Sequence, residues 1–413
     1  MEGSKIKYLD YYLYFLFFTE IIVNLGVWSG FNYFRGIVII FYVMWLFFET
    51  LKPVKNSAII ILLVFILYSF ILVMFSRNFY ESFYNYNKVF TSLLFFPIAA
   101  NYLSYEKILR IFEVFGNITI IYAAYLLIAI SLGIGEGTYI DDVYTRGGVN
   151  SNTLTYFAII SPGLLMVNMF KGTKKVVFIL STLVCVIFIL LSMKRTIMIM
   201  LLISLFIYLI SIDRKLRFQY IRFFVIGIII LYATHNYWLN IFAARYEHRE
   251  HLMRIETEVL QGELRTVELE AVLKEVFQFD NLSYSFFGRS AYYTPGEYGI
   301  NVGYFFGPNR MIHNDVALLF NSTGIFGFLL YFSFLLVVIK RYILFKNYKK
   351  FIYRGNVFFT LYTIILVASL INMYNGSFYG TANRTLVFIF LGLMFTRPIF
   401  ESQEKTSQQS SSN

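Results

Sequence analysis

Long apolar runs recur along most of the chain, and short polar or basic segments separate them. A helix needs about 20 apolar residues to cross the roughly 30 Å hydrocarbon core of a bilayer, so each run predicts one membrane-spanning helix. The runs lie near residues 10–28, 32–50, 57–76, 87–103, 110–133, 152–170, 174–192, 196–212, 219–239, 313–339, 356–373 and 384–399. This pattern predicts an all-α polytopic membrane protein with about 12 transmembrane helices.

The composition supports the bilayer as the solvent for most of the chain. Of the 413 residues, 58% are hydrophobic and 14% are charged, whereas soluble proteins average about 45–50% and about 25%. The net charge of +11 does not by itself indicate nucleic acid, because membrane proteins concentrate Lys and Arg in cytoplasmic loops. Cys185 is the only cysteine, which excludes a disulfide framework or a cysteine-based metal site within one chain.

The basic residues predict the orientation of the helices. With the N-terminus in the cytoplasm, about 21 Lys and Arg fall on the inner side and about 7 on the outer side, as the positive-inside rule requires. An even number of helices then leaves both termini in the cytoplasm. The cations assigned to the short outer loops or their edges are Arg35, Arg77, Lys88, Arg146, Lys194, Arg195 and Arg384.

One long segment interrupts the alternation of apolar runs and short polar segments. Residues 1–239 hold helices one to nine, and residues 240–312 form a large loop that the orientation places outside. Helices ten to twelve follow in residues 313–399, and residues 400–413 form a polar cytoplasmic tail expected to be disordered. The first part of the loop has the apolar spacing of an amphipathic helix, and the rest is rich in Gly and Tyr. Because long loops in compact proteins are usually functional or disordered and this one is aromatic, we expect it to carry function.

The end of the large loop holds a candidate for proton transfer. His313, Asn314 and Asp315 come directly before the tenth predicted helix. A histidine can accept a proton from a hydroxyl near neutral pH, and the positive end of a helix dipole disfavours the protonated imidazole. The competing interpretation is an interfacial histidine that caps the helix, and position alone favours that interpretation.

Arginines on the outer side form a second candidate. Arg146 and Arg195 lie near short outer loops, and Arg265 and Arg310 lie in the large loop. Guanidinium groups bind phosphate oxygens through paired hydrogen bonds and stabilise the charge of a departing pyrophosphate. Snorkelling toward lipid headgroups explains any single arginine equally well. Glu20, inside the first predicted helix, is either a functional group or an internal hydrogen-bond acceptor for a neighbouring helix.

The stretch HNDVALLFNSTGIFG resembles a signature of the O-antigen ligase and polymerase superfamily. That signature is His followed by Asn, Ser or Gln, nine residues, Gly, two residues, and then Gly, Thr or Tyr. Here His313, Asn314, Gly324 and Gly327 match it in full. SMKRT before the eighth predicted helix and GELRTVELEAVLKEVFQF in the loop look like further elements of the family, and RGGVNSNTLTYF is similar to another outer-face segment. The resemblance covers about residues 145–335.

The resemblance implies a metal-independent glycosyltransferase that needs no cofactor and acts on undecaprenyl-pyrophosphate-linked glycans at the outer face of the bacterial inner membrane. It implies that His313 activates the acceptor hydroxyl and that Asn314 orients His313. It further implies that Arg195 and Arg265 hold the pyrophosphate, with Arg146 and Arg310 as weaker candidates. Its partners would be a lipid-linked glycan donor, a glycan acceptor, the bilayer and possible chain-length regulators. The run Asn321–Gly324 is polar for the centre of a membrane span, so we expect a kink or helix packing there.

Several activities fit this arrangement. The first is a polymerase that transfers a growing lipid-linked chain onto the next repeat unit. The second is a ligase that moves the glycan to a lipid A core or a protein, and both use the same donor. A transporter or flippase of twelve helices is a third, although the large loop follows helix nine and not helix six, where two six-helix halves would join. A polyprenyl-phosphate sugar transferase would need an acidic motif in the first outer loop, which has no acid.

Overall fold

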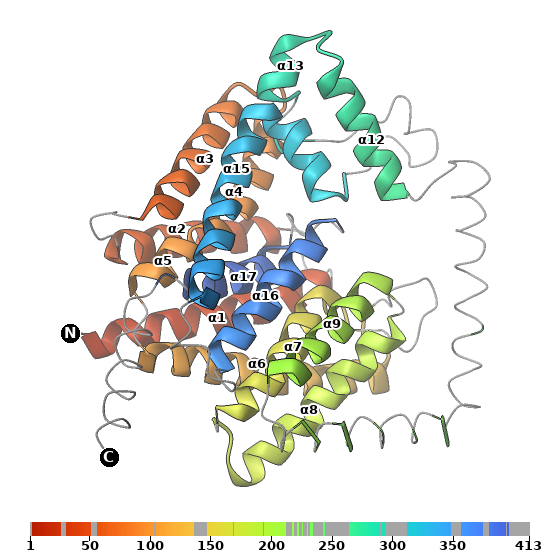
Figure 1. The fold of residues 1–413 in the computed structure, drawn as a ribbon. Coiled ribbons are helices and arrows are strands. Elements are labelled where there is room, and N and C mark those ends of the chain that lie inside the picture. Colours follow the sequence, from red (N-terminus) through yellow and green to blue (C-terminus); the bar gives the residue numbers. More distant parts are fainter. Residues whose placement is uncertain are drawn as a thin grey trace.

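The computed structural model shows the chain folded into a bundle of helices (Figure 1). It describes residues 2–25, 30–50, 56–102, 105–135, 147–167, 169–192, 194–211, 264–289, 291–293, 312–347, 357–374, 380–393 and 395, with scattered positions between 217 and 243. Over these residues the secondary structure is helical, and they contain no strand. The predicted all-α architecture is therefore confirmed for the part of the chain that is described.

The helices follow the apolar runs closely. Before the large loop they are α1 (Glu2–Asn24), α2 (Phe31–Thr50), α3 (Ser57–Met74), α4 (Phe79–Leu93), α5 (Phe95–Tyr102), α6 (Tyr105–Leu132), α7 (Ser151–Met166), α8 (Gly172–Leu191) and α9 (Arg195–Ser211). From the loop onward they are α12 (Leu264–Phe277), α13 (Leu282–Phe287), α15 (Asp315–Asn347), α16 (Val357–Met373) and α17 (Thr381–Leu393).

Within the described part of the chain, five helices are long and apolar enough to cross a membrane, which supports the predicted membrane protein. They are α2, α3, most of α6, α8 and α15, and the shorter α9, α16 and α17 are also apolar. The predicted run 87–103 is instead two helices, α4 and α5, which meet at Leu94; Pro97 lies in the first turn of α5, where a missing N–H costs no helical hydrogen bond. The run 219–239 and the tail 400–413 lie outside the described residues except for scattered positions, so the count of twelve remains a prediction.

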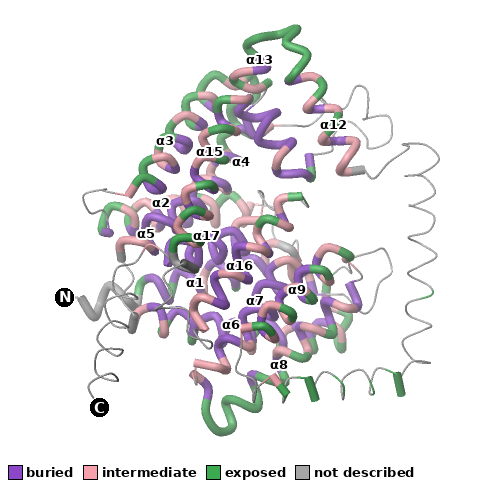
Figure 2. Tube along the Cα trace, viewed as in Figure 1, coloured by how far each residue is buried: buried purple, intermediate pink, exposed green. Residues whose placement is uncertain are grey.

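The most enclosed helices are α7 and α17. Every residue of α17 from Ala382 to Leu393 is buried, and so are 12 of the 16 residues of α7. The surrounding helices instead turn large apolar side chains outward, and Figure 2 shows exposed positions along the periphery around a buried interior. Phe41, Leu67 and Phe206 are 73%, 60% and 62% exposed. Because contiguous exposed apolar surface is unfavourable in water, this periphery fits contact with lipid.

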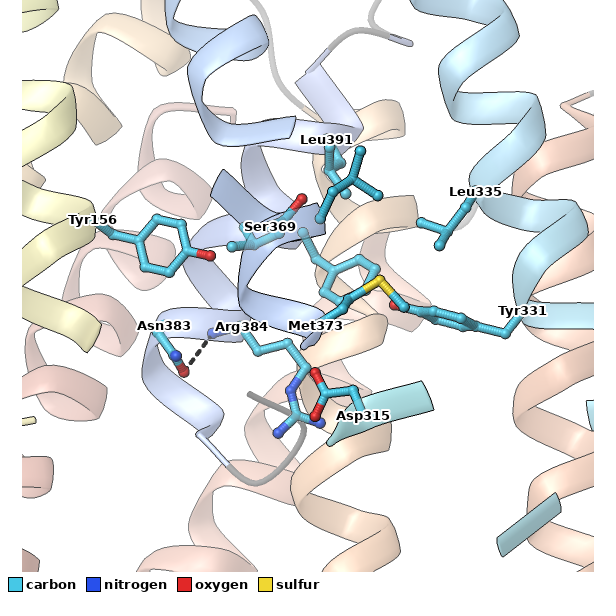
Figure 3. Close-up of a pocket in the computed structure, with 12 residues that line it drawn as sticks. Tyr156, Asp315, Tyr331, Leu335, Ser369, Met373, Asn383, Arg384 and Leu391 are labelled. Atoms are coloured by element: carbon cyan, nitrogen blue, oxygen red, sulfur yellow. Dashed lines mark hydrogen bonds between the residues drawn. The ribbon is translucent and has the colours of Figure 1, made fainter. Parts of the chain in front are cut away.

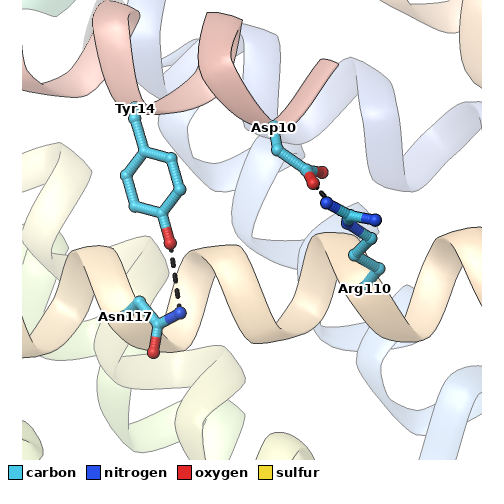
Figure 4. Close-up of polar contacts among 4 residues, drawn as sticks. All are labelled: Asp10, Tyr14, Arg110 and Asn117. Atoms are coloured by element: carbon cyan, nitrogen blue, oxygen red, sulfur yellow. Dashed lines mark hydrogen bonds and ion pairs between the residues drawn. The ribbon is translucent and has the colours of Figure 1, made fainter. Parts of the chain in front are cut away.

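Polar contacts join α1 to α6 (Figure 4). Asp10 of α1 forms an ion pair with Arg110 of α6, and Asn117 donates to the hydroxyl of Tyr14 at 3.1 Å. Polar contacts of this kind add to the packing between neighbouring helices. They fix the register of the two helices.

The helix α15 is broken at Gly324. Its φ of 62° and ψ of −168° belong to a region that only glycine populates. A Cβ added there would lie 2.4 Å from the backbone carbonyl of Phe286, so α13 packs directly on the break. The kink and close packing expected for Asn321–Gly324 are therefore confirmed, and the glycine of the signature has a structural reason.

The break frees backbone carbonyls that other elements satisfy. The Thr323 carbonyl accepts a hydrogen bond from the hydroxyl of Tyr68 on α3 at 2.9 Å, and the Asn321 carbonyl accepts one from the N–H of Arg289 at 2.8 Å. Non-helical backbone is tolerated at membrane depth only where protein groups supply such partners. Gly327, the second glycine of the signature, lies against Thr323 and Tyr68 with no room for a Cβ.

Two parts of the large loop dock on the bundle. Along α12, Glu268, Val272 and Val276 are buried at four-residue spacing against the first part of α15. Further on, Tyr292 is buried between α3 and α4: its hydroxyl bonds Ser69 at 3.1 Å, and its carbonyl accepts from Asn85 at 3.0 Å. Burial raises the pKa of Tyr292 to about 12, so its hydroxyl stays protonated.

Candidate functional site

The signature residues form the turn that starts α15. The side chain of His313 is exposed, and its backbone N–H donates to the carboxylate of Glu268 on α12 at 3.0 Å. Asn314 is buried, and its Oδ1 accepts the N–H groups of Val316 and Ala317 at 2.9 and 3.1 Å. Asn314 is thus the N-cap of α15, which leaves the imidazole of His313 to project from the turn.

The Nδ2 atom of Asn314 is buried without a hydrogen-bond partner among the described residues. A buried donor of this kind carries a desolvation cost unless another group meets it. It stands next to His313 in the chain, where an acceptor oxygen or a water would satisfy it. The structure shows Asn314 as a helix cap, and a role in orienting His313 stays a prediction.

Arg265 lies close to this turn. It precedes Glu268 by three residues on α12, so the two side chains share one face of the helix, and Glu268 contacts the backbone of His313. Thr266, the next residue, contacts the hydroxyl of Tyr374 at the end of α16 at 2.6 Å. The start of α12 is therefore fixed beside both the His313 turn and the end of α16.

Arg195 stands at the same end of the bundle. Short turns join α7 to α8 and α8 to α9, so α7 and α9 run in the same direction. Tyr156, near the start of α7, and Met373, near the end of α16, line one cavity, which places the end of α16 beside the start of α7. Arg195 is the first residue of α9, and its side chain is exposed there. Arg146 and Arg310 lie outside the described residues.

A small cavity lies beneath the turn, between α7, α15, α16 and α17 (Figure 3). Asp315 and Arg384 line it, are almost fully buried and point toward one another in Figure 3. The neighbouring Asn383 side chain accepts the backbone N–H of Arg384 at 2.9 Å. The cavity holds about 30 Å³, room for one or two water molecules but too little for a sugar ring. A ligand the size of a sugar would therefore not fit inside it.

Three residues of this site were not among the sequence-based candidates for its chemistry. Glu268 had only its helical spacing to distinguish it, and the fold alone reveals its contact with His313. Asp315 directly follows the signature pair, and Arg384 is one of the outer-side cations. An acidic residue and an arginine at the starts of two apolar helices were the available signal that they would meet, because charges inside membranes are expensive unless paired or hydrated.

The chain matches no protein-family model and no curated protein. The resemblance of residues 145–335 to the ligase and polymerase superfamily consequently rests on the signature residues and on their surroundings. Two features of the structure agree with the signature. Both of its glycines occupy positions that exclude a side chain, and its histidine is exposed at the beginning of the same helix.

Proposed function

We propose that the chain is a membrane glycosyltransferase that polymerises undecaprenyl-pyrophosphate-linked oligosaccharide repeat units into a surface polysaccharide. The observation that supports this most is the contact between Glu268 and the backbone of His313, which joins an exposed imidazole to the arginine-bearing turn of α12. The second candidate, a ligase that transfers the same glycan to lipid A core or protein, shares this donor. In both cases the site faces outward from the bacterial inner membrane and both termini are cytoplasmic.

The proposed step uses His313 as a general base. Its neutral imidazole accepts the proton of an acceptor hydroxyl, and the hydroxyl oxygen attacks the anomeric carbon of the donor glycan. The bond from that carbon to the pyrophosphate oxygen breaks, and the lipid pyrophosphate leaves with the electron pair. Arg265 and Arg195 bind its oxygens and stabilise the growing charge, with Arg146 and Arg310 as further candidates. This step is complete without a metal ion or cofactor.

The first test is the variant His313→Ala in a strain that lacks the native gene, with lipid-linked glycan lengths read on a gel. Because the side chain is exposed, the variant should fold, and removal of a general base should reduce extension by about 100-fold or more. Lys274→Ala, an exposed substitution elsewhere on α12, is the matched control and should extend chains normally.

The pattern of products separates the candidates. A single repeat unit left on the lipid anchor supports the polymerase, whereas long chains that stay on the lipid anchor indicate the ligase. A repeat unit that is reachable only from the cytoplasmic side indicates a flippase. Wild-type chain lengths in His313→Ala would refute the catalytic role of this histidine.

A further inference from the structure

An aromatic patch covers one side of the α12–α13 hairpin. It consists of Phe277, Phe279, Leu282, Phe287 and Phe326, the last from α15, and these side chains are 51%, 43%, 61%, 45% and 45% exposed. Isolated exposed apolar residues are common, but a contiguous group of this size marks a surface that contacts something other than water.

Ring contacts make the patch continuous. Phe326 packs on Phe286 and Phe287 with ring centroids 5.2 and 5.5 Å apart. Phe286 contacts Phe279 at 6.1 Å, and Phe279 contacts Phe277 at 6.3 Å. The patch therefore runs without interruption from the break in α15 to the end of α12.

The patch also continues into the apolar periphery of the bundle. Beyond Phe326, the side chains of Leu329, Phe332 and Leu336 are exposed along α15 at three- and four-residue spacing, on a helix long and apolar enough to span a membrane. Phe326 and Leu329 also line a shallow groove against Tyr68 of α3. The hairpin thus extends the same surface that the spanning helices present to lipid.

One strained backbone position in the hairpin carries an aromatic residue. Phe279 has a φ of 57°, a conformation that glycine usually provides where a helix ends. A phenylalanine is strained there, and it is not part of the buried core: 43% of its surface is exposed, and its ring contacts are with Phe277 and Phe286 of the same hairpin. Contact with a surface outside the chain explains why an aromatic residue occupies this position.

Polar residues in the hairpin limit how deeply it can insert into a bilayer. Gln278 and Asp280 alternate with the phenyl rings and are exposed, as are Glu270 and Lys274 on α12. Glu275 pairs with Arg289 at 3.1 Å. Glu270 and Lys274 share the exposed face of α12 with Phe277, so charges border the rings. Aromatic rings bordered by charged residues are typical of segments that lie in the plane of the bilayer interface.

We propose that the α12–α13 hairpin rests in the headgroup region of the lipid bilayer through this aromatic patch. The proposal does not depend on a glycosyltransferase activity or on which leaflet is the outer one. Its consequence is that the turn of His313, fixed to α12 through Glu268, lies at the level of lipid headgroups. A substrate with a lipid anchor then reaches the turn sideways from the membrane.

Single cysteines provide the test, because the native Cys185 is fully buried and the unmodified chain serves as the labelling blank. Leu282→Cys carries an environment-sensitive fluorophore in the patch, and Lys274→Cys carries it at the charged border of the patch, one helical turn before Phe277, as the matched control. The full-length protein is placed in phospholipid nanodiscs. Quenching is measured with a nitroxide-labelled phospholipid and with aqueous iodide.

The proposal predicts that the nitroxide lipid quenches the label at Leu282→Cys at least about twofold more than at Lys274→Cys, with the reverse order for iodide. Iodide quenching that is equal at both positions, or shielding of Leu282→Cys from both quenchers by protein, would overturn it. A second variant keeps the test independent of stability: Phe279→Gly suits the positive φ and removes only the ring. It should lower lipid quenching at position 282, and an unchanged ratio would remove Phe279 from the contact.

Discussion

Glu20 and Asp315 are both buried carboxylates that lie near an arginine, and they differ in what surrounds the charges. Glu20 of α1 accepts hydrogen bonds from the hydroxyls of Tyr122 and Thr153 at 3.3 and 3.2 Å, with Arg35 of α2 within electrostatic reach. Asp315 faces Arg384 across a small cavity and is two residues from the exposed His313. The first carboxylate ties α1 to α6 and α7, whereas the second lies directly below an accessible side chain.

This difference separates a structural charge from a candidate functional one. A buried ion costs several kcal/mol unless hydrogen bonds and opposite charge compensate it, and Glu20 obtains both from neighbouring helices. Of the two explanations that the sequence left open for Glu20, the internal hydrogen bond to a neighbouring helix is the one the structure supports. The surroundings of Asp315 have room for water, an exposed imidazole and an arginine-bearing helix. The free-energy cost of burying a charge therefore does not by itself identify a functional site.

The largest effect is expected at the helix break. In Gly324→Ala the new methyl group meets the Phe286 carbonyl at 2.4 Å in a backbone region closed to L-residues, which should cost about 2–6 kcal/mol of stability. Thermal unfolding in detergent measures it. Gly36→Ala is the control, because its Cβ meets nothing within 4 Å and should stabilise α2 by about 0.5–1 kcal/mol. Equal melting temperatures for the two variants would show that α15 does not need its break.

The two carboxylates can be compared directly with isosteric amides. Asp315→Asn leaves the buried Arg384 facing a neutral group and should cost about 3 kcal/mol, together with most glycan extension. Glu20→Gln keeps an oxygen that accepts from Tyr122 and Thr153. Arg35 loses an opposite charge but is only partly buried and still donates to the Leu16 carbonyl at 3.2 Å, so the loss should be about 1 kcal/mol with activity retained. Thermal unfolding and glycan gels report both. Comparable losses of activity in the two variants would remove the distinction between the regions.

Substitutions of Arg265 test whether the region around His313 binds pyrophosphate. If it binds pyrophosphate through a guanidinium fork, Arg265→Ala should reduce glycan extension by about 100-fold and Arg265→Lys by about 10-fold, since lysine offers a point charge. Arg195 should show the same order. Arg289→Ala, which loses the exposed pair with Glu275 and a cation–π contact with the Tyr284 ring at 5.6 Å, should remain close to wild type in glycan extension. Equal effects of Ala and Lys at position 265 would argue against a phosphate clamp.

The sequence predicted the parts of this molecule that depend on local patterns. Apolar runs located most helices, and the polar run Asn321–Gly324 predicted the break in α15. The apolar runs did not separate two helices that meet without a polar segment between them, as α4 and α5 do at Leu94. Hydropathy along the chain carries no information about a change of helix direction.

The site was predictable only for residues inside a recognisable pattern. His313 and Asn314 stood out through the signature, but their structural roles did not: the asparagine and not the histidine caps α15. Glu268 lies 45 positions before His313 in the chain, and Asp315 meets Arg384 only after α15, α16 and α17 pack together. Such contacts follow from tertiary packing, which no spacing along one helix encodes.

The smallest expected effect concerns two tyrosine hydroxyls. Tyr68→Phe removes the donor to the Thr323 carbonyl, and Tyr122→Phe removes the donor to the Phe17 carbonyl at 2.6 Å and to Glu20. Each should lower the free energy of unfolding by about 1 kcal/mol, measured by thermal unfolding. Only Tyr68→Phe should also slow glycan extension, because the Thr323 carbonyl belongs to the break that positions the start of α15. If Tyr122→Phe slows extension as much as Tyr68→Phe at equal stability, the Glu20 cluster belongs to the working site and the division between the two regions is wrong.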